Sequence, residues 1–191
     1  MADFRLETGR LVLRSWTRPD LARFAQVTNT PAVMRWLGGL LSDERLDQLY
    51  DAVIGCEDEH GHCFWLVERK ADGGHLSGEL LGFCGLKRGN APESTFPGGF
   101  EIGWRLREEA WGKGYAKEAA IASLDAGFER FGAQEIVAIT VSENTASWGL
   151  MERLGMRRRT DLDYVDSRFD PPLCDTLAWS ITSGEWRARH D

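Results

Sequence analysis

The chain has 191 residues, of which 42% are hydrophobic and 28% are charged. This composition is typical of a soluble globular domain with a substantial core, and it excludes a globally disordered chain. The net charge of −7, from 23 basic and 30 acidic residues, argues against general binding to nucleic-acid phosphates. It fits a cationic substrate better, although solubility alone also explains it.

The first sixteen residues, MADFRLETGRLVLRSW, do not have the pattern of a signal peptide. Their apolar run is short and is interrupted by Arg10 and Arg14. No stretch of the sequence approaches the ~20 apolar residues that a membrane span needs. We therefore expect a cytoplasmic protein that makes no contact with a membrane.

The first quarter of the chain predicts one strand followed by helices. Residues 10–16 alternate apolar and polar side chains, as a half-buried strand does. Apolar residues at helical spacing then predict a helix over 17–29, with Thr17 as a possible cap. A short helix over 31–38 and a longer one that begins at Ser42 and ends near residue 55 follow.

The segment CEDEHGHC, residues 56–63, contains two of the four cysteines and two histidines. Its spacing matches no zinc pattern, and no second ligand cluster accompanies it. We expect a polar loop here and no metal. The four cysteines should be reduced thiols; they are Cys56, Cys63, Cys84 and Cys174.

The rest of the chain alternates strands with two helices. Four-residue spacing of Ala116, Ala120, Leu124 and Phe128 marks the longer helix, over 115–131. The second helix is expected over 145–154, and strands are expected over 63–70, 79–88, 98–107, 135–142, 156–165 and 173–182. This order predicts an α/β domain in which helices flank a mixed, mostly antiparallel sheet, with residues 1–191 forming a single domain.

Gly112 and Gly114 stand between a predicted strand and a predicted helix. The first N–H groups of a helix lack internal partners, so such a turn suits a phosphate. The P-loop pattern G-x-x-x-x-G-K-[ST] fails, because Lys113 is followed by Gly114. The Rossmann fingerprint also fails, because Lys117 stands where its third small residue belongs.

The stretch WGKGYA, residues 111–116, resembles the pyrophosphate loop of the GCN5-related N-acetyltransferase (GNAT) family, [Q/R]-x-x-G-x-[G/A], with Trp111 in place of Gln or Arg. The motifs GRLVLR and EIGWRL, and N-x-x-S-x-x-x-x-x-x-LG from Asn144 to Gly155, are similar to its branch that acetylates ribosomal-protein N-termini (RimJ/RimL-like). The resemblance spans about residues 9–182. It implies the single-domain GNAT fold and acetyl-CoA as co-substrate.

The resemblance also implies where acetyl-CoA binds. The pyrophosphate would be held mainly by backbone groups of the turn, at Gly112, Lys113, Gly114, Tyr115 and Ala116. A second set would contact the pantetheine arm, the first three through their backbone as an added strand does; it comprises Trp104, Arg105, Leu106 and Asn144. Asn144 may equally cap the helix that follows it, and Trp111 and Tyr115 may simply be core aromatics.

Acetyl transfer to an amine needs a base for the attacking nitrogen and a proton for the leaving thiolate. Glu101 is the candidate base, and its alternative role is that of an exposed strand carboxylate. Ser147 is the candidate partner of the sulfur, since Met151 occupies the position where many relatives have a Tyr acid. Backbone N–H groups near Trp104 would stabilise the oxyanion.

The sequence does not name the acceptor, which may be a protein N-terminus or a small-molecule amine. Segments 33–39, 90–98 and 163–175 are expected to border its pocket, with Trp36 and Tyr164 in the pocket or the core. Acidic residues of the last segment may attract a cation, or may only be solvated; they are Asp163, Asp166, Asp170 and Asp175. A non-catalytic acyl-CoA-binding module is the alternative function. The protein would be a monomer or homodimer.

Overall fold

A computed structural model describes residues 4–189 of the chain. The strands are β1 (Arg5–Glu7), β2 (Leu11–Arg14), β3 (Phe64–Arg69), β4 (Leu80–Arg88), β5 (Phe100–Leu106), β6 (Glu135–Thr140), β7 (Arg157–Arg158), β8 (Tyr164–Val165) and β9 (Asp175–Thr182). The α-helices are α1 (Asp20–Thr28), α2 (Pro31–Met34), α3 (Asp43–His60), α4 (Tyr115–Glu129), α5 (Thr145–Arg153) and α6 (Ser183–Arg187). Two 3-10 helices are η1 (Glu108–Ala110) and η2 (Thr160–Leu162).

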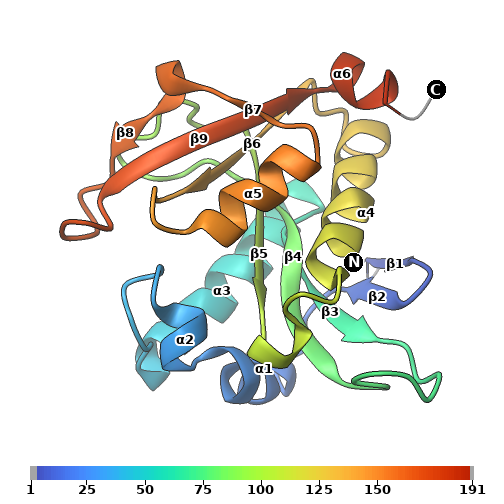
Figure 1. Cartoon of the computed structure of the whole chain (residues 1–191). Coiled ribbons are helices and arrows are strands. Elements are labelled where there is room, and N and C mark those ends of the chain that lie inside the picture. Colours follow the sequence, from blue (N-terminus) through green and yellow to red (C-terminus); the bar gives the residue numbers. More distant parts are fainter. Residues whose placement is uncertain (1–3, 190–191) are drawn as a thin grey trace.

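The strands of the described chain form one mixed sheet in the order β1-β2-β3-β4-β5-β6-β9-β7, and β8 pairs with β9. Every pairing is antiparallel except that of β5 with β6. Helices cover both faces of the sheet (Figure 1). The predicted α/β architecture, with a mostly antiparallel sheet flanked by helices, is confirmed.

Strand alternation divides the buried side chains between two cores. On β3, Trp65 and Val67 belong to the cluster that contains α4, whereas Leu66 belongs to the cluster that contains α1 and α3. On β5, Ile102 and Leu106 face the α4 side in the same way. Each fully buried side chain of this size contributes about 1.5–3 kcal/mol of transfer free energy. The sheet is therefore fixed in register by apolar residues on both of its faces.

A gap opens between β5 and β6. The two strands pair only at Phe100 with Ile136 and at Glu101 with Val137, although β5 continues to Leu106 and β6 to Thr140. On its other edge, β5 pairs with β4 over its whole length. The edge of β5 that faces β6 is thus left without a neighbouring strand beyond Glu101, and α4 and α5 lie near this opening (Figure 1).

Several helix and strand boundaries differ from those predicted from the sequence. Helix α3 runs to His60 and ends at Gly61, which has a φ of +74°, so most of the predicted loop over residues 56–63 is helical. Thr17 does not cap α1; its hydroxyl donates to Asp20 at 2.7 Å instead. The single strand expected over 156–165 is divided into β7, η2 and β8. The short elements β1 and α6 were not predicted.

Two further observations concern residues 4–189. No helix in this range is long and apolar enough to cross a membrane. No three or more of its His, Cys, Asp and Glu side chains form a group that could hold a metal ion. The four cysteines are free thiols.

Candidate active site

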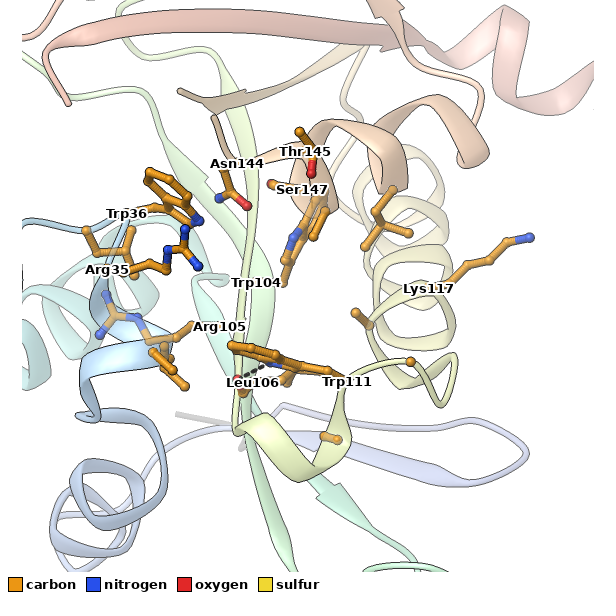
Figure 2. A pocket seen from close by; sticks show the side chains of 18 of the residues that line it. Arg35, Trp36, Trp104, Arg105, Leu106, Trp111, Lys117, Asn144, Thr145 and Ser147 are labelled. Carbon is orange, nitrogen blue, oxygen red and sulfur yellow. Dashed lines mark hydrogen bonds between the residues drawn. The ribbon is translucent and has the colours of Figure 1, made fainter. Parts of the chain in front are cut away.

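A cavity of about 610 Å³ lies beside the unpaired end of β5, and its other walls come from the α2 region, the glycine turn, α4 and residues 143–153. Figure 2 shows β5 passing through it, with α2 on one side and α4 and α5 on the other. The predicted residues that line the cavity are Trp104, Arg105, Leu106, Gly112, Gly114, Ala116, Asn144 and Ser147. The structure therefore brings most of the predicted site together, although these residues come from three separate segments of the chain.

The glycine turn presents unpaired backbone donors at one end of this cavity. Gly112 and Gly114 have φ values of +69° and +79°, in the left-handed region that favours glycine. Gly114 is the N-cap of α4 and supplies no side-chain cap. In the described structure, the N–H groups of residues 112–117 make no hydrogen bond. With the helix dipole behind them, these donors form an anion site.

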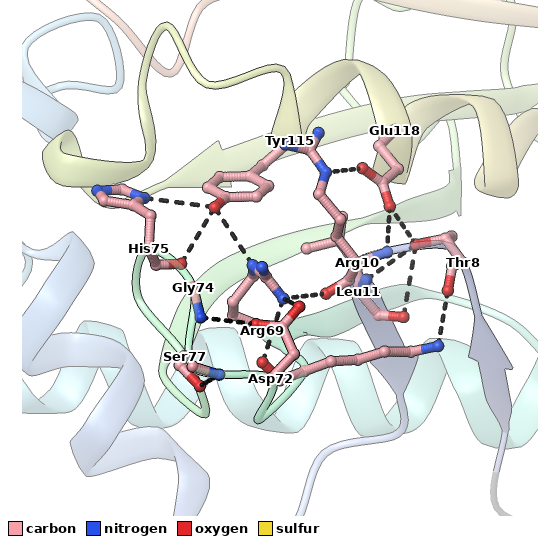
Figure 3. Close-up of polar contacts among 12 residues, drawn as sticks. Thr8, Arg10, Leu11, Arg69, Asp72, Gly74, His75, Ser77, Tyr115 and Glu118 are labelled. Atoms are coloured by element: carbon pink, nitrogen blue, oxygen red, sulfur yellow. Dashed lines mark hydrogen bonds and ion pairs between the residues drawn. The ribbon is translucent and has the colours of Figure 1, made fainter.

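A network of hydrogen bonds holds the turn in place (Figure 3). The Glu118 carboxylate accepts from the Arg10 backbone N–H and from Arg10 Nε, both at 2.7 Å, and from the Thr8 hydroxyl at 2.5 Å. The Arg10 Nη1 donates to the carbonyl oxygen of Lys113 at 3.0 Å. This network ties the glycine turn and the first turn of α4 to the connection between β1 and β2, so the N–H donors are positioned before any ligand binds.

Tyr115 and Lys113 do not line the cavity. The Tyr115 side chain is 2% exposed. Its hydroxyl accepts from Arg69 Nε at 3.2 Å and donates to the carbonyl oxygen of His75 at 3.1 Å (Figure 3). Its side chain is therefore a core aromatic, as the alternative interpretation held. A role of either residue in binding rests on its backbone N–H.

The backbone groups of Trp104, Arg105 and Leu106 on β5 do not all point toward the gap. Arg107 N–H donates to Leu81 on β4, so antiparallel alternation directs the backbone groups of Arg105 to β4 and those of Trp104 to the gap. Arg105 therefore cannot pair with a pantetheine arm through its backbone, contrary to the prediction. The Leu106 carbonyl faces the gap but accepts from Trp111 Nε1 at 2.8 Å (Figure 2).

Asn144 and Ser147 form the α5 wall of the cavity. Asn144 occupies the N-cap position of α5, but its side chain makes no capping hydrogen bond. Its carbonyl oxygen accepts from the Ser147 N–H at 3.0 Å instead. The alternative prediction, that the Asn144 side chain caps α5, is therefore wrong. The Asn144 amide is left free to contact a ligand.

Glu101 lies outside the cavity lining. It is 7% exposed and forms an ion pair with Lys87 Nζ at 2.9 Å, so it is not the exposed strand carboxylate of the alternative interpretation. Burial raises the pKa of Glu101, although the Lys87 ammonium opposes this shift. The Phe64 ring covers Gly103, two residues farther along the same face of β5.

The segments expected to border the acceptor are only partly correct. Val33, Trp36 and Leu37 do line the cavity, whereas no residue of 90–98 or 163–175 does. Asp163 pairs with Arg158 at 2.5 Å and Asp166 pairs with Arg168 at 2.6 Å, so these two carboxylates are neutralised. The expected cation-attracting role of these two residues is therefore wrong, and Tyr164 is not part of the cavity.

The sequence did not predict that several charged side chains would gather in the cavity lining. One is acidic, Glu143, and four are basic; these are Arg35, Arg105, Lys117 and Arg153. Arg35 directly follows α2, Glu143 precedes α5, and the other three come from β5, α4 and α5, so only the tertiary structure assembles them. No local motif marks such a set. The cavity is cationic although the chain is acidic overall.

Comparisons with known proteins identify the family of the chain. A family model described as an acetyltransferase (GNAT) domain matches residues 10–157. The Bacillus subtilis protein YkkB is 32% identical over 156 residues, which are 81% of this chain and 86% of that protein.

Solved structures share the fold. An acetyltransferase from Agrobacterium tumefaciens str. C58 has a TM-score of 0.77 at 24% identity, and the match covers 96% of both chains. A spermidine N-acetyltransferase from Vibrio cholerae, solved with CoA and spermine, has a TM-score of 0.71 at 21% identity, covering 94% of this chain and 99% of that one. With the family model matching most of its length, the chain belongs to the GNAT family of acetyltransferases.

Proposed function

We propose that the protein transfers the acetyl group of acetyl-CoA directly to a primary amine, within a ternary complex. One observation carries this proposal: unpaired N–H donors of the glycine turn, the free edge of β5 and the Ser147 hydroxyl all face one cavity. The primary amine would belong to a protein N-terminus or to a small molecule.

Different residues of the chain would bind different parts of acetyl-CoA. The N–H groups of residues 112–116 would hold the pyrophosphate, with Lys117 adding positive charge. The N–H and carbonyl of Trp104, which face the gap, would pair with an amide of the pantetheine arm. The Asn144 amide would contact the same arm from the opposite wall. Trp111, which is 49% exposed at the rim, offers an aromatic surface there.

The reaction forms a C–N bond and breaks a C–S bond. The ammonium form of the acceptor first loses a proton, and its nitrogen lone pair then attacks the thioester carbonyl carbon. The Trp104 N–H would stabilise the negative oxygen of the tetrahedral intermediate. When the C–S bond breaks, the sulfur takes the electron pair and a proton from Ser147, and the second proton lost by the attacking nitrogen restores the Ser147 hydroxyl. The amide, free CoA thiol and one released proton balance the equation.

Replacing Ser147 by alanine is expected to lower kcat by about 10–100-fold while leaving the KM for acetyl-CoA nearly unchanged, because the hydroxyl acts on the leaving sulfur and not on ground-state binding. Steady-state kinetics that follow thiol release measure both constants. Ser142→Ala is the control, since Ser142 bonds to Glu143 and does not line the cavity. Equal kcat values for Ser147→Ala and the parent would remove Ser147 from the mechanism.

Glu101 is proposed as the base, acting through water because its carboxylate lies outside the cavity. Burial raises the pKa of Glu101, so kcat/KM should rise with pH through a limb above the ordinary carboxyl range. Glu101→Gln is expected to abolish this limb and to lower kcat/KM by about 100-fold. A pH profile of both proteins tests this. If the variant keeps the limb and its rate, the Glu101–Lys87 pair is only structural.

A further inference from the structure

The basic side chains of the cavity lie on two sides of β5. Lys117 lies on the α4 side with the glycine turn, whereas Arg35 and Arg105 lie on the α2 side with Trp36 (Figure 2). The phosphates of acetyl-CoA account for charge near the glycine turn. They do not account for two arginines across the strand.

Arg105 has no anionic partner in the described structure. Its guanidinium carries five N–H donors, yet it forms no ion pair or side-chain hydrogen bond, and its Nε is buried without an acceptor. It lies 5.2 Å from the centre of the Phe83 ring and 5.8 Å from that of Phe24. Burial lowers the pKa of Arg105 to about 10, so the group still remains charged at neutral pH.

An unpaired buried charge is costly to a folded protein, because little offsets the loss of its hydration. Arg69, a buried arginine on the α4 side of the sheet, is satisfied by Asp72 at 2.9 Å and by backbone carbonyl oxygens. Arg88, whose Nε is also buried without an acceptor, at least donates to the Gly98 carbonyl oxygen at 3.3 Å, whereas the Arg105 guanidinium makes no hydrogen bond within the described residues and lies on the wall of a cavity. Binding sites typically contain groups of this kind, which lower the stability of the free protein.

Arg35 adds a second charge on the same side. It is exposed, it stacks on the Trp36 ring at 4.2 Å, and no carboxylate of residues 4–189 pairs with it. Two guanidinium groups match an oxyanion in geometry and charge. They oppose a polyamine by like-charge repulsion.

We propose that the acceptor of this acetyltransferase is a small amine that also carries a carboxylate, which Arg105 binds with help from Arg35. The inference rests on the proposed function, since it assigns the acceptor half of the same cavity. Trp36, Val33 and Leu37 would contact the carbon skeleton between the two charged groups. The amine then points toward the gap beside Trp104.

The test compares amino acids with their decarboxylated amines, so that each pair differs only in the carboxylate. The acceptors are the twenty standard amino acids and a series of ω-amino acids, with 4-aminobutyrate, propylamine and 1,4-diaminobutane as a matched trio. Thiol release from acetyl-CoA is measured as kcat/KM for each. In at least one pair the carboxylated member should be preferred by about tenfold or more, and 1,4-diaminobutane should be the poorest of its trio.

Arg105→Met keeps the length of the stem and removes the charge. It should abolish the preference by lowering kcat/KM for the carboxylated member far more than for its decarboxylated partner, and its Tm without ligand should equal or exceed that of the parent. Arg88→Met is the control, because Arg88 is a partly buried arginine of β4 that stacks on Phe100 and does not line the cavity. It should leave the preference unchanged.

Three results would overturn the inference: a general preference for decarboxylated amines, a preference that survives in Arg105→Met, or no accepted amine in either set while acetyl-CoA still binds. A lower Tm for Arg105→Met would instead assign Arg105 to the fold and also contradict it. Failure to bind acetyl-CoA in a separate titration would refute the proposed function itself, so the two failures are distinguishable.

Discussion

Gly114→Val is expected to weaken acetyl-CoA binding by at least about 100-fold, equal to about 2.7 kcal/mol, while the protein remains folded. A valine cannot adopt the φ of +79° without strain of about 1–2 kcal/mol. Its Cβ would lie 3.4 Å from Arg10 Nη2, so it would also disturb the network that positions the turn. The added methyl groups would occupy the space in which we place the pyrophosphate. Calorimetric titration measures the change in affinity.

Gly132→Val is the matched control for this variant. Gly132 has a φ of +69°, open space around its Cβ position and no place in the cavity lining. It should suffer a similar loss of stability and bind acetyl-CoA as the parent does. If Gly114→Val binds acetyl-CoA with the parent's affinity, the pyrophosphate does not lie at this turn.

Gly82→Ala is expected to destabilise the fold by about 4 kcal/mol or more, a loss that only a few mechanisms produce. Gly82 has a φ of +141°, and a Cβ there would lie 2.0 Å from the carbonyl oxygen of Arg105. Both the steric clash and the backbone conformation involve main-chain atoms, which cannot move aside as a side chain does. The residue forms part of a bulge on β4, where Val67 pairs with Gly82 but Glu68 pairs with Leu80.

Denaturant unfolding of the purified variant measures this loss, and Gly55→Ala provides the contrast. Gly55 is an exposed residue of α3 with nothing within 4 Å of its Cβ position. Alanine there should stabilise the protein by about 0.5–1 kcal/mol, because glycine is the poorer helix former. A Gly82→Ala protein as stable as the parent would mean that the bulge can relax, and that β5 does not depend on it for its position.

The sequence predicts those parts of the site that depend on local chemistry. Two glycines before an alanine-rich helix require a turn with positive φ, and the structure places both there. The Asn144 and Ser147 positions follow from the start of a helix after a strand, which the sequence also shows. Such features need few contacts beyond neighbouring residues, so local patterns are sufficient to find them.

The remainder depends on contacts between distant segments. Sequence patterns place Glu101 on a strand but do not show that Lys87 pairs with it or that Phe64 lies beside it. Arg35, at the end of α2, and Arg105 of β5 both line the cavity. They are brought together only by the packing of the first helices on the sheet. The overall acidity of the chain pointed to a cationic substrate, whereas the cavity lining is mostly basic. The net charge of a chain does not show where its charged side chains gather.

The most direct test of the account is a calorimetric titration of the protein with acetyl-CoA, alongside ATP and NAD. The account predicts selective, saturable binding of acetyl-CoA, because the cavity offers both phosphate donors and a free strand edge for the pantetheine arm. No binding of acetyl-CoA, or equal binding of all three ligands, would contradict the assignment of this cavity.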